Sequence, residues 1–345
     1  MIPHSRPYVG AKEINAVVCA LKKSHLAQGA EVEKLERKLS CIYGGAEAVV
    51  VSSGTAALYL SLLAIGVKSD DEVIIPSYTC NSLYAAVNLT GAKALCADVG
   101  KNSVNIDSST IYPLLNKKVS ALIVPHMFGF LANIKAIKEI GIPVIEDCAQ
   151  AAGGRYPDGT LTGTKGDIAI LSFYATKLIP AGEGGACITK NRKMAGIIRS
   201  LRDCDKQIPK EKAFNFKMTD ISAALAAVKL ASLGANIHQR SQIAEVFDKT
   251  FVRESFRTIS RDPQSVCFRY LLTVQKHIAS ILRASQKAGI VCSKPTWRAL
   301  HHAVAGNRCP NTEILERTLL SVPLYSGLTE KEVRNICHFL CTQLT

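Results

Sequence analysis

Apolar residues near the start of the chain recur every three to four positions, which is the spacing of one face of an α-helix. Two such series lie on either side of a polar break at Gln28–Ala30: Ile14, Val17, Val18 and Leu21, and then Val32, Leu35, Leu39 and Ile42. The pattern predicts two amphipathic helices, each with an apolar face that packs against another part of the protein.

From residue 48 onward, short apolar runs alternate with stretches of helical periodicity. The runs are Ala48–Val51, Glu72–Ile75, Lys93–Ala97, Ala121–Pro125, Pro143–Glu146, Ile168–Phe173 and Ala186–Thr189. Most of them lack the alternation of apolar and polar residues that marks a half-exposed strand, as expected when helices cover both faces of a sheet. The repeated order of strand and helix therefore predicts an α/β fold with a largely parallel central sheet and helices on both faces.

The pattern changes after residue 240. Three predicted helices and a group of short strands follow: Gln242–Phe251, Ala279–Ala288 and Glu330–Leu340, with strands around Phe268–Val274. We therefore expect a large α/β domain over residues 1–240 and a smaller α+β domain over residues 241–345, joined through a helix near Ile221–Leu233. We also expect residues 1–25 to pack on the small domain.

The composition is that of a folded globular protein, with 48% hydrophobic and 20% charged residues in a chain of 345. No polar low-complexity tract is present, which argues against disorder. The longest apolar runs have the length of strands rather than of membrane spans, and Met1–Gly10 lacks the apolar segment of a signal peptide. We expect a soluble, cytoplasmic protein with no membrane association.

Twelve cysteines are scattered along the chain without a CxxC pair. Several of them, including Cys19, Cys96, Cys148 and Cys187, stand in apolar stretches, which is typical of small buried thiols in a reducing compartment. No spacing of cysteines and histidines matches a zinc module. We therefore expect neither a disulfide framework nor a metal site.

The formal net charge of +14 raises the question of an anionic partner. The basic residues form only short runs, such as Lys22–Lys23, Lys117–Lys118 and Lys210–Lys212, and no nucleic-acid-binding module is recognisable. A positive field that attracts small anionic ligands explains the charge, and so does a solvated basic surface without a specific partner. We expect no nucleic-acid partner.

The first segment with candidate chemistry is Ser52–Ala57, which follows a predicted strand and opens a predicted helix. Free backbone N–H groups and the helix dipole favour an anion at such a place, and Gly54 allows a close approach of the backbone. Serine and threonine are also the preferred residues for capping a helix. Taken alone, the segment fits a phosphate cradle and a plain helix cap equally well.

Two further segments place reactive side chains at strand ends. Val144–Gln150 ends an apolar strand with Glu146 and Asp147, and a buried carboxylate there needs a cationic or hydrogen-bonding partner. Ser172–Lys177 delivers a lysine into a loop that glycines follow, and a desolvated lysine forms Schiff bases. A capping aspartate and a surface lysine are the structural alternatives for these segments.

The order of cradle, strand-end aspartate and strand-end lysine is the order found in fold-type-I pyridoxal-phosphate (PLP) enzymes. The chain resembles the DegT/DnrJ/EryC1/StrS family of sugar aminotransferases over nearly its whole length. The segments that carry the resemblance are Ser5–Gly10, Ser53–Leu58, Asp71–Ser77, Ile145–Gln150, Ser172–Lys177, Gly182–Gly185, Asn215–Asp220, Ser321–Tyr325 and Gly327–Thr329. The family's fold is the predicted α/β arrangement with a smaller C-terminal domain.

The resemblance implies a role for each matching residue around the cofactor ring. Lys177 would carry PLP as a Schiff base and then act as general acid and base in the 1,3-proton shift. Asp147 would pair with the pyridine nitrogen, and Gln150 would lie by the ring hydroxyl.

The resemblance also implies which residues bind the cofactor phosphate. Gly54, Thr55 and Ser172 would bind it within the subunit, and Asn215 would reach the phosphate of the neighbouring subunit's cofactor. The active sites would then lie at the interface of a homodimer. For Asn215, a turn residue before the predicted Met218–Leu230 helix is the alternative interpretation.

One position departs from the family pattern. Many members have an aromatic residue after the threonine that matches Thr79, where it stacks on the pyridine ring, but this chain has Cys80. Either Cys80 packs on the ring as a small polarizable group, or Tyr78 or another residue takes that place. His126, before a glycine turn, fits the family pattern, and we favour a structural role for it over contact with substrate.

The C-terminal segment Pro295–His302 contains the single tryptophan of the chain. Trp297, Arg298 and His301 together could contact an anionic or sugar-like substrate. As an alternative, Trp297 could be an ordinary packing anchor of the small domain.

These observations predict an aminotransferase that works by a ping-pong Schiff-base mechanism. Its amino donor would be glutamate, and its acceptor would be a keto-sugar, linked to a nucleotide. A PLP-dependent lyase or dehydratase acting on a related sugar is one alternative, although family dehydratases have histidine where this chain has Lys177. A non-catalytic regulatory protein that retains the fold is another, but such a protein has no need of the lysine.

Overall fold

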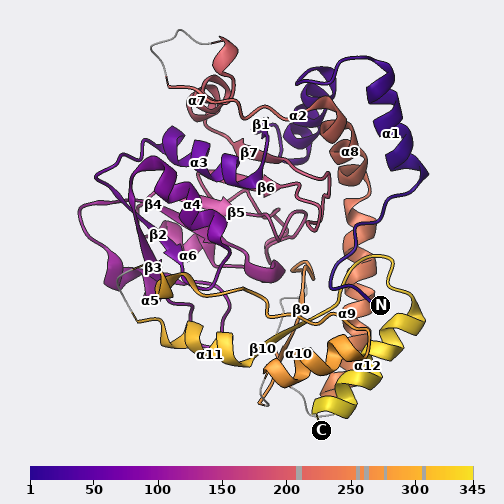
Figure 1. Cartoon of the computed structure of the whole chain (residues 1–345). Coiled ribbons are helices and arrows are strands. Elements are labelled where there is room, and N and C mark those ends of the chain that lie inside the picture. The colour runs from indigo at the N-terminus through magenta and orange to yellow at the C-terminus, as the bar shows by residue number, and fades with distance from the viewer. Residues whose placement is uncertain (207–211, 254–256, 260–263, 276–277, 305–307, 345) are drawn as a thin grey trace.

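The computed structural model describes residues 1–206, 212–253, 257–259, 264–275, 278–304 and 308–344. A large body with a central sheet forms the upper and left parts of the view in Figure 1, and a smaller body with its own sheet lies below. The prediction of a mixed α/β fold is thereby confirmed.

The central sheet has seven strands in the order β1-β7-β6-β5-β4-β2-β3. Its strands are β1 (Glu47–Val51), β2 (Glu72–Pro76), β3 (Lys93–Ala97), β4 (Val119–Pro125), β5 (Val144–Asp147), β6 (Ile168–Ser172) and β7 (Gly185–Thr189). β7 runs antiparallel to both of its neighbours, and the other pairs are parallel. The prediction of a largely parallel sheet is therefore confirmed.

Helices cover both faces of this sheet, which explains why its strands lack a polar side. Val49 of β1 belongs to a buried cluster that also includes residues of α3 (Gly54–Ile65), α4 (Asn81–Thr90) and α7 (Arg192–Arg202). The next residue, Val50, belongs to the opposite cluster with α2 (Ala30–Ile42) and α8 (Asp220–Ala231). Because successive strand residues point to opposite faces, each strand had to be apolar throughout.

Shorter elements complete the large body. They are the helices α5 (Ser108–Ile111) and α6 (Ile134–Lys138) and the 3₁₀ turns at Tyr112–Leu114, Met127–Gly129 and Cys204–Lys206. α5 and α6 contribute Ile111, Ile134 and Ile137 to a buried cluster on the β4 and β5 side of the sheet.

The smaller body contains a three-stranded antiparallel sheet in the order β10-β9-β8. Its elements are β8 (Arg257–Thr258), β9 (Tyr270–Thr273), β10 (Leu319–Val322), α10 (Ile278–Lys287), α11 (Pro310–Thr318), α12 (Glu330–Leu344) and a 3₁₀ turn at Leu300–His302. The long helix α9 (Leu233–Arg253) enters it from the large body, so a division at residue 240 falls inside this helix. Phe247 and Phe251 of α9 belong to the core of the smaller body.

The N-terminal segment spans the two bodies. Ile2 packs in the core of the small body, and His4 bonds to Ser321 of β10. The following helix α1 (Ala11–Lys22) instead lies along α8 of the large body. Only the first few residues of the segment 1–25 therefore contact the small body.

The apolar face predicted for α1 is largely exposed. Ile14, Val18 and Leu21 keep 54%, 39% and 47% of their surface, whereas Ala20 is buried. Cys19 is exposed as well, so the expectation that it is buried is wrong, because α1 meets α8 through another face. Cys96, Cys148 and Cys187 are buried as expected, and none of the twelve cysteines, all of which lie in the described residues, forms a disulfide.

Within the described residues, no single helix is both long and apolar enough to cross a membrane. α8 and α9 reach that length and hydropathy only when joined, and they are bent by 58° relative to each other.

Candidate active site

The candidate residues meet at one edge of the central sheet. β1 ends before Ser52, β5 ends at Asp147 and β6 ends at Ser172. These strands run in the same direction, so their carboxyl ends face the same side, where open α/β sheets bind ligands. The parallel topology thus brings together side chains that are far apart in the sequence.

The N-terminus of α3 forms a tightly packed turn at this edge. The Ala56 N–H donates to Ser53 Oγ at 3.0 Å, so Ser53 is a helix cap. A Cβ on Gly54 would lie 2.9 Å from the Cβ of Ser172, which shows that the cradle and the end of β6 touch. On the other side, a Cβ on Gly185 would come within 2.6 Å of the Ser53 carbonyl oxygen. Ser53 therefore caps the helix, and only glycine fits at Gly54 and Gly185.

Lys177 lies in a turn that hydrogen bonds define. The Phe173 N–H donates to the Gly184 carbonyl at 2.8 Å, and the Lys177 N–H donates to the Tyr174 carbonyl at 2.8 Å. Gly184 has φ +141° and packs against Met218, a conformation and a contact that a side chain would disturb. The glycines after the lysine thus serve to bring the chain back along β6.

The amino group of Lys177 is buried beside a ring. Its Nζ lies 5.3 Å from the centroid of Phe268. Burial lowers the pKa of Lys177, and the charge of Arg269 adds to this, while Cys80 and Asp147 act in the opposite direction. A lysine with a lowered pKa has a larger neutral fraction and is a better nucleophile.

Asp147 is the buried carboxylate of the site, with 5% of its surface exposed. Its Oδ1 accepts one hydrogen bond, from the Ala149 N–H at 2.9 Å. Burial raises the pKa of Asp147, and the hydrogen bond from Ala149 and the charge of Lys177 lower it. Among the ion pairs of the described residues, none joins Asp147 to Lys177, so the two interact across a distance rather than in direct contact.

Gln150 is fixed through its oxygen. Gln150 Oε1 accepts the N–H of Phe128 at 2.7 Å, so the amide N–H groups of the side chain remain available as donors. Phe128 has φ 58°, and a Cβ on Gly129 would lie 1.9 Å from the Val266 carbonyl oxygen. This turn therefore anchors Gln150 and at the same time contacts the chain that leads into β9.

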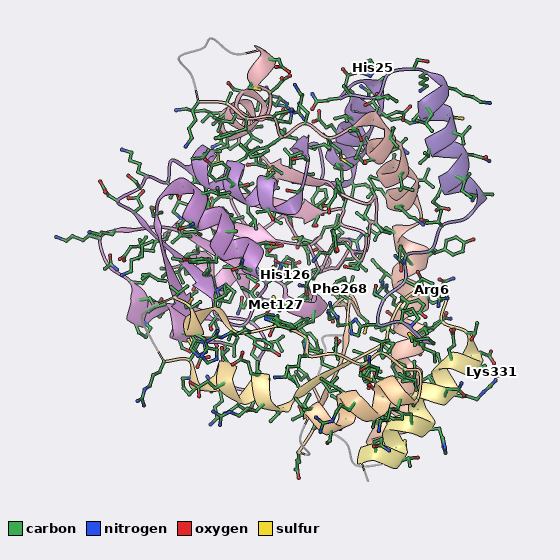
Figure 2. The ribbon with its side chains drawn as sticks, viewed as in Figure 1. Arg6, His25, His126, Met127, Phe268 and Lys331 are labelled. Atoms are coloured by element: carbon green, nitrogen blue, oxygen red, sulfur yellow. The ribbon has the colours of Figure 1, made fainter. Side chains whose placement is uncertain are left out.

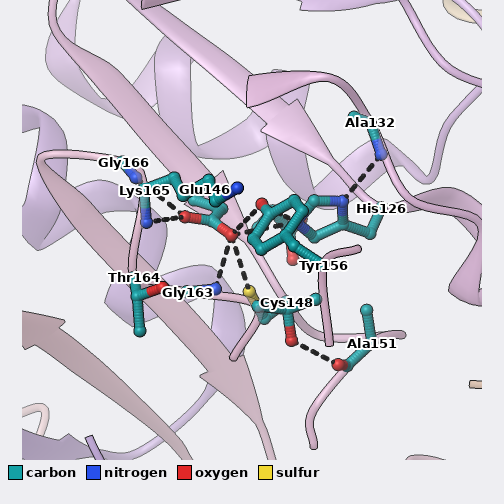
Figure 3. Close-up of polar contacts among 12 residues, drawn as sticks. His126, Ala132, Glu146, Cys148, Ala151, Tyr156, Gly163, Thr164, Lys165 and Gly166 are labelled. Atoms are coloured by element: carbon teal, nitrogen blue, oxygen red, sulfur yellow. Dashed lines mark hydrogen bonds and ion pairs between the residues drawn. The ribbon is translucent and has the colours of Figure 1, made fainter. Parts of the chain in front are cut away.

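His126 and Glu146 form a buried network on the other side of β5 (Figure 3). His126 Nδ1 accepts the Ala132 N–H at 2.9 Å, which assigns the proton to Nε2 and its bond to Glu146 Oε1 at 3.0 Å. Glu146 also accepts the Tyr156 hydroxyl at 2.5 Å and backbone N–H groups of the 163–166 loop. His126 is fully buried here, in agreement with the structural role favoured above.

These hydrogen bonds occupy atoms that could otherwise bind a metal ion, and they lower the pKa of Glu146. Ligand atoms of His126, Glu146 and Cys148 lie within 4.8 Å of one another, but the bonds described above already occupy His126 Nδ1 and both oxygens of Glu146. Burial alone would raise the pKa of Glu146, but its hydrogen bonds to His126 and Tyr156 lower it below the usual value. The two carboxylates at the strand end thus differ, because successive strand residues face opposite sides.

Cys80 and Tyr78 differ in their surroundings. Cys80 is exposed at the start of α4 and interacts electrostatically with Lys177. Tyr78 is 1% exposed, and its ring packs edge-on against Phe128 with centroids 6.0 Å apart. Tyr78 is therefore held inside the core, whereas Cys80 is exposed and interacts with the charge of Lys177.

The Pro295–His302 segment lies against the same edge of the sheet. The Leu300 N–H donates to the Ser77 carbonyl at 2.9 Å, and His301 Nδ1 is 2.5 Å from Ser77 Oγ. Trp297 is 97% exposed, so the alternative that it is a packing anchor is wrong. Arg298 is exposed beside it. The tryptophan precedes the 3₁₀ turn at Leu300–His302, and Leu300 and His301 of that turn make the packing contacts instead.

Asn215 is exposed next to its own subunit's cradle. The carbonyl of Phe216 accepts the Ser52 N–H at 2.8 Å, and the backbone of Asn215 pairs with Asp203. Phe214 and Phe216 stack on each other with centroids 5.1 Å apart. The segment that bears Asn215 is therefore held by backbone bonds and rings while its own side chain faces outward.

Two residues near Lys177 were missed by the sequence analysis, Phe268 and Arg269. Figure 2 shows Phe268 in the middle of the molecule, between the sheet and the small body. Both stand in a small-domain strand region whose sequence carries no motif, so no local signal could have pointed to them. A cavity of about 620 Å³ also opens beside Lys177, and Arg6, Tyr8 and Lys229 are among the residues that line it.

Comparison with known proteins agrees with this geometry. A model of the DegT/DnrJ/EryC1/StrS aminotransferase family matches residues 7–341. The chain is similar to the structure of an aminotransferase, TlmJ, from Streptoalloteichus hindustanus, with 24% identity, a TM-score of 0.92 and coverage of 100% of this chain and 99% of that one.

Two further structures are similar over almost their full length. A putative sugar aminotransferase, Spr1654, from Streptococcus pneumoniae in its PLP form has 22% identity and a TM-score of 0.92, with coverage of 100% of this chain and 99% of that one. DesV from S. venezuelae has 25% identity and a TM-score of 0.91, with coverage of 97% and 94%. The fold of the whole chain is thus that of fold-type-I aminotransferases.

Proposed function

Because the chain belongs to the DegT/DnrJ/EryC1/StrS aminotransferase family, whose enzymes depend on PLP, we propose that it transfers an amino group from glutamate to a keto-sugar linked to a nucleotide. The observation that carries the proposal is the buried amino group of Lys177, which interacts electrostatically with the buried carboxylate of Asp147 at the carboxyl edge of the sheet. The net charge of +14 favours an anionic acceptor such as a nucleotide-linked sugar.

The residues of the site fit the cofactor by their chemistry. Buried Asp147 needs a cationic partner, which the protonated ring nitrogen would be. The amide N–H groups of Gln150 suit the ring hydroxyl, since its oxygen is already bonded to Phe128. When bound, PLP supplies an electron sink that stabilises negative charge on the carbon next to the transferred nitrogen.

The phosphate would lie at the start of α3. Gly54 leaves room between the helix and Ser172, and the hydroxyls of Thr55 and Ser172 offer donors beside the backbone N–H groups. Ser53 is engaged as the helix cap and holds this turn in place.

Lys177 would have two roles. Its Nζ would hold the cofactor covalently, and after release it would move the proton at the substrate carbon as general base and acid. Burial lowers the pKa of Lys177 and so increases the neutral fraction that both roles need. The buried ring of Phe268 beside Nζ excludes water from this proton transfer.

We also propose that the working unit is a homodimer in which Asn215 reaches the partner's cofactor phosphate. The exposed apolar residues of α1 support this, because Ile14, Val18 and Leu21 form a predicted packing face that this chain leaves uncovered. The exposed side chain of Asn215 is available for such a contact.

The proposal is tested by the visible absorbance of the purified protein with PLP. We expect an absorbance band that shifts when L-glutamate is added and returns when a keto-sugar acceptor follows. Lys177→Ala should abolish the shift and reduce turnover by roughly 10³-fold or more, since it removes both the attachment and the acid–base group. Lys165→Ala serves as control, because Lys165 pairs with Asp158 in another loop.

Two results would contradict the proposal. One is a Lys177→Ala variant that keeps the activity of the wild type. The other is a wild-type protein that binds PLP but transfers no amino group from glutamate to any member of a panel of free and nucleotide-linked keto-sugars.

A further inference from the structure

Arg269 is a half-buried cation at the junction between the sheet and the small body. Its N–H donates to the carbonyl of Phe128 at 3.3 Å, and Phe128 in turn donates its N–H to Gln150. Its charge is close enough to lower the pKa of Lys177. Arg269 is therefore linked to Gln150 through the backbone of Phe128, and it interacts electrostatically with Lys177.

The side chain of Arg269 has a neutral partner. Arg269 Nη1 lies 3.0 Å from both ring nitrogens of His4, and His4 Nε2 lies 2.9 Å from Ser321 Oγ. Burial and the charge of Arg269 lower the pKa of His4 to about 3, so the imidazole is neutral at ordinary pH. A neutral imidazole has one donor and one acceptor nitrogen. The unprotonated ring nitrogen accepts from Arg269, and Nε2 bonds to the Ser321 hydroxyl.

In the part of the chain that the structure describes, no carboxylate balances the charge of Arg269. Among the ion pairs of the described residues none includes Arg269, and none includes its buried neighbour Arg240. Arg240 is satisfied by neutral groups, because it donates to the carbonyls of Phe268 and Leu324. Lys177, also half-buried, adds a third cation, and Asp147 is reserved for the cofactor ring. An uncompensated buried charge is costly, so this arrangement favours an anion that arrives with the substrate.

The guanidinium is also shaped for a planar anion. His4 occupies Nη1, which leaves the Nε and Nη2 edge of Arg269 to donate two parallel hydrogen bonds to a carboxylate. A small cavity lined by His4 and Arg269 shares Ser5 and Thr176 with the larger cavity beside Lys177. Arg269 therefore borders the space in which a substrate would meet the lysine.

We propose that Arg269, positioned by His4 of the N-terminal segment, binds the carboxylate of the amino donor. The proposal rests on the aminotransferase function and names the residue that recognises its acidic donor. Arg269 contacts the substrate, and His4 is a positioning residue that orients the guanidinium without adding negative charge.

The test uses the first half-reaction of the PLP-loaded enzyme with L-glutamate, followed by absorbance. Arg269→Gln should raise the half-saturating glutamate concentration by roughly 100-fold, because a charge-assisted bidentate contact is lost. Arg269→Lys keeps the charge but loses the planar guanidinium, and it should raise the half-saturating glutamate concentration by roughly 10-fold. Arg334→Gln, an exposed arginine of α12, is the matched control and should leave the value unchanged.

His4 is tested by rescue. His4→Ala should raise the half-saturating concentration by roughly 10-fold with little change in the limiting rate, because the arginine remains but is less well oriented. His4→Gln, whose amide can accept from Arg269 and donate to Ser321, should recover most of the affinity. Hydroxylamine, which reacts with the bound cofactor but has no carboxylate, should react at the wild-type rate in every variant.

The outcomes separate this proposal from the aminotransferase function itself. If the wild-type enzyme shows no shift with glutamate, the function has failed. If the wild type reacts but Arg269→Gln has the same half-saturation with glutamate, the assignment of Arg269 is wrong. It is also wrong if Arg269→Gln weakens only a nucleotide-linked acceptor in the second half-reaction.

The choice of donor distinguishes the two carboxylates of glutamate. L-alanine carries only the α-carboxylate, and 4-aminobutyrate carries only the distal one. If Arg269→Gln weakens the binding of L-alanine as well as L-glutamate, Arg269 binds the α-carboxylate. If Arg269→Gln instead weakens the binding of 4-aminobutyrate, Arg269 binds the distal carboxylate. Either result supports the proposal.

Discussion

At the scale of single residues, environment separates side chains that the sequence presents together. Glu146 and Asp147 are neighbours at the end of β5, yet they face opposite sides of the sheet. Glu146 accepts hydrogen bonds from Tyr156, His126 and a backbone loop, whereas Asp147 accepts one from Ala149. The first is a structural carboxylate, and the second retains the capacity to hold a cationic ring nitrogen.

The hydrogen bonds of Glu146 predict a pH-dependent stability. Its pKa is lowered in the folded protein, so its contribution is present above the unfolded value of 4.5 and is lost as the pH falls below that value through the folded pKa. Glu146→Gln should lower the free energy of unfolding by about 3 kcal/mol at pH 7, because the backbone donors and Tyr156 lose a charged acceptor. Urea unfolding at pH 7 and pH 4 measures both effects.

The same experiment has a matched control in Glu139→Gln, an exposed glutamate just after α6. It should change the unfolding free energy by no more than about 0.5 kcal/mol. A Glu146→Gln variant as stable as the wild type at pH 7 would show that the network is not a source of stability.

Cys80 provides a second prediction at this scale. If it occupies the place where related enzymes stack an aromatic ring on the cofactor, then Cys80→Phe should bind PLP more tightly, by roughly 3- to 10-fold, because an aromatic contact is added. The affinity is measured by the rate at which the PLP-loaded protein releases its cofactor to an excess of another, cofactor-free PLP enzyme. Cys204→Phe, at another exposed cysteine, is the control, and faster release from Cys80→Phe would argue against the stacking position.

At the scale of elements, the glycines and the helix caps decide how the site is built. Ser53 caps α3, and Gly54 allows the helix to approach Ser172 of β6. Gly184 and Gly185 return the chain along β6 after the loop that bears Lys177. The sequence indicated both glycine positions, but the contact between them became visible only when β1 and β6 were seen on either side of β7.

Helix α1 is the element whose packing differs most from expectation. Its apolar residues were predicted to pack against this chain, but Ile14, Val18 and Leu21 are exposed while α1 rests on α8. A periodic pattern shows that a face will be covered but not by which chain. The exposed apolar face of α1 therefore supports the proposal that a second copy of the chain covers it.

At the scale of the whole molecule, the N-terminal segment joins the two bodies across the site. His4 holds Arg269 and Ser321 of the small body, while the Tyr8 carbonyl accepts a hydrogen bond from Lys229 of α8. Arg6 lies 5.7 Å above the ring of Tyr325 between these contacts. The segment thus forms one wall of the cavity beside Lys177.

The proposed dimer gives a prediction at this scale. Ile14→Glu combined with Leu21→Glu should produce a folded monomer, because both side chains are exposed in the single chain but would meet a partner, and burying such a residue contributes about 1.5 to 3 kcal/mol. Sedimentation measures the mass, and activity should fall with dissociation because Asn215 would no longer reach a partner's cofactor.

Gln286→Glu, on the exposed side of α10, is the control for added charge and should leave the assembly intact. A double variant that remains dimeric would exclude α1 from the interface. A monomer with full activity would remove the proposed role of Asn215 in a neighbouring site.

The sequence by itself determined the alternation of strands and helices, the strand ends that bear Asp147 and Lys177, and the glycines around them, because periodicity and turn chemistry are local properties. Only the tertiary structure decided that Glu146 serves the core, that Trp297 is exposed and that His4 supports Arg269. These facts depend on which segments meet in space, and His4 and Arg269 are far apart in a chain whose small-domain strands carry no motif. Whether a charged side chain is buried depends on which distant segments pack around it. The cations near Lys177 could therefore be recognised only in the folded molecule.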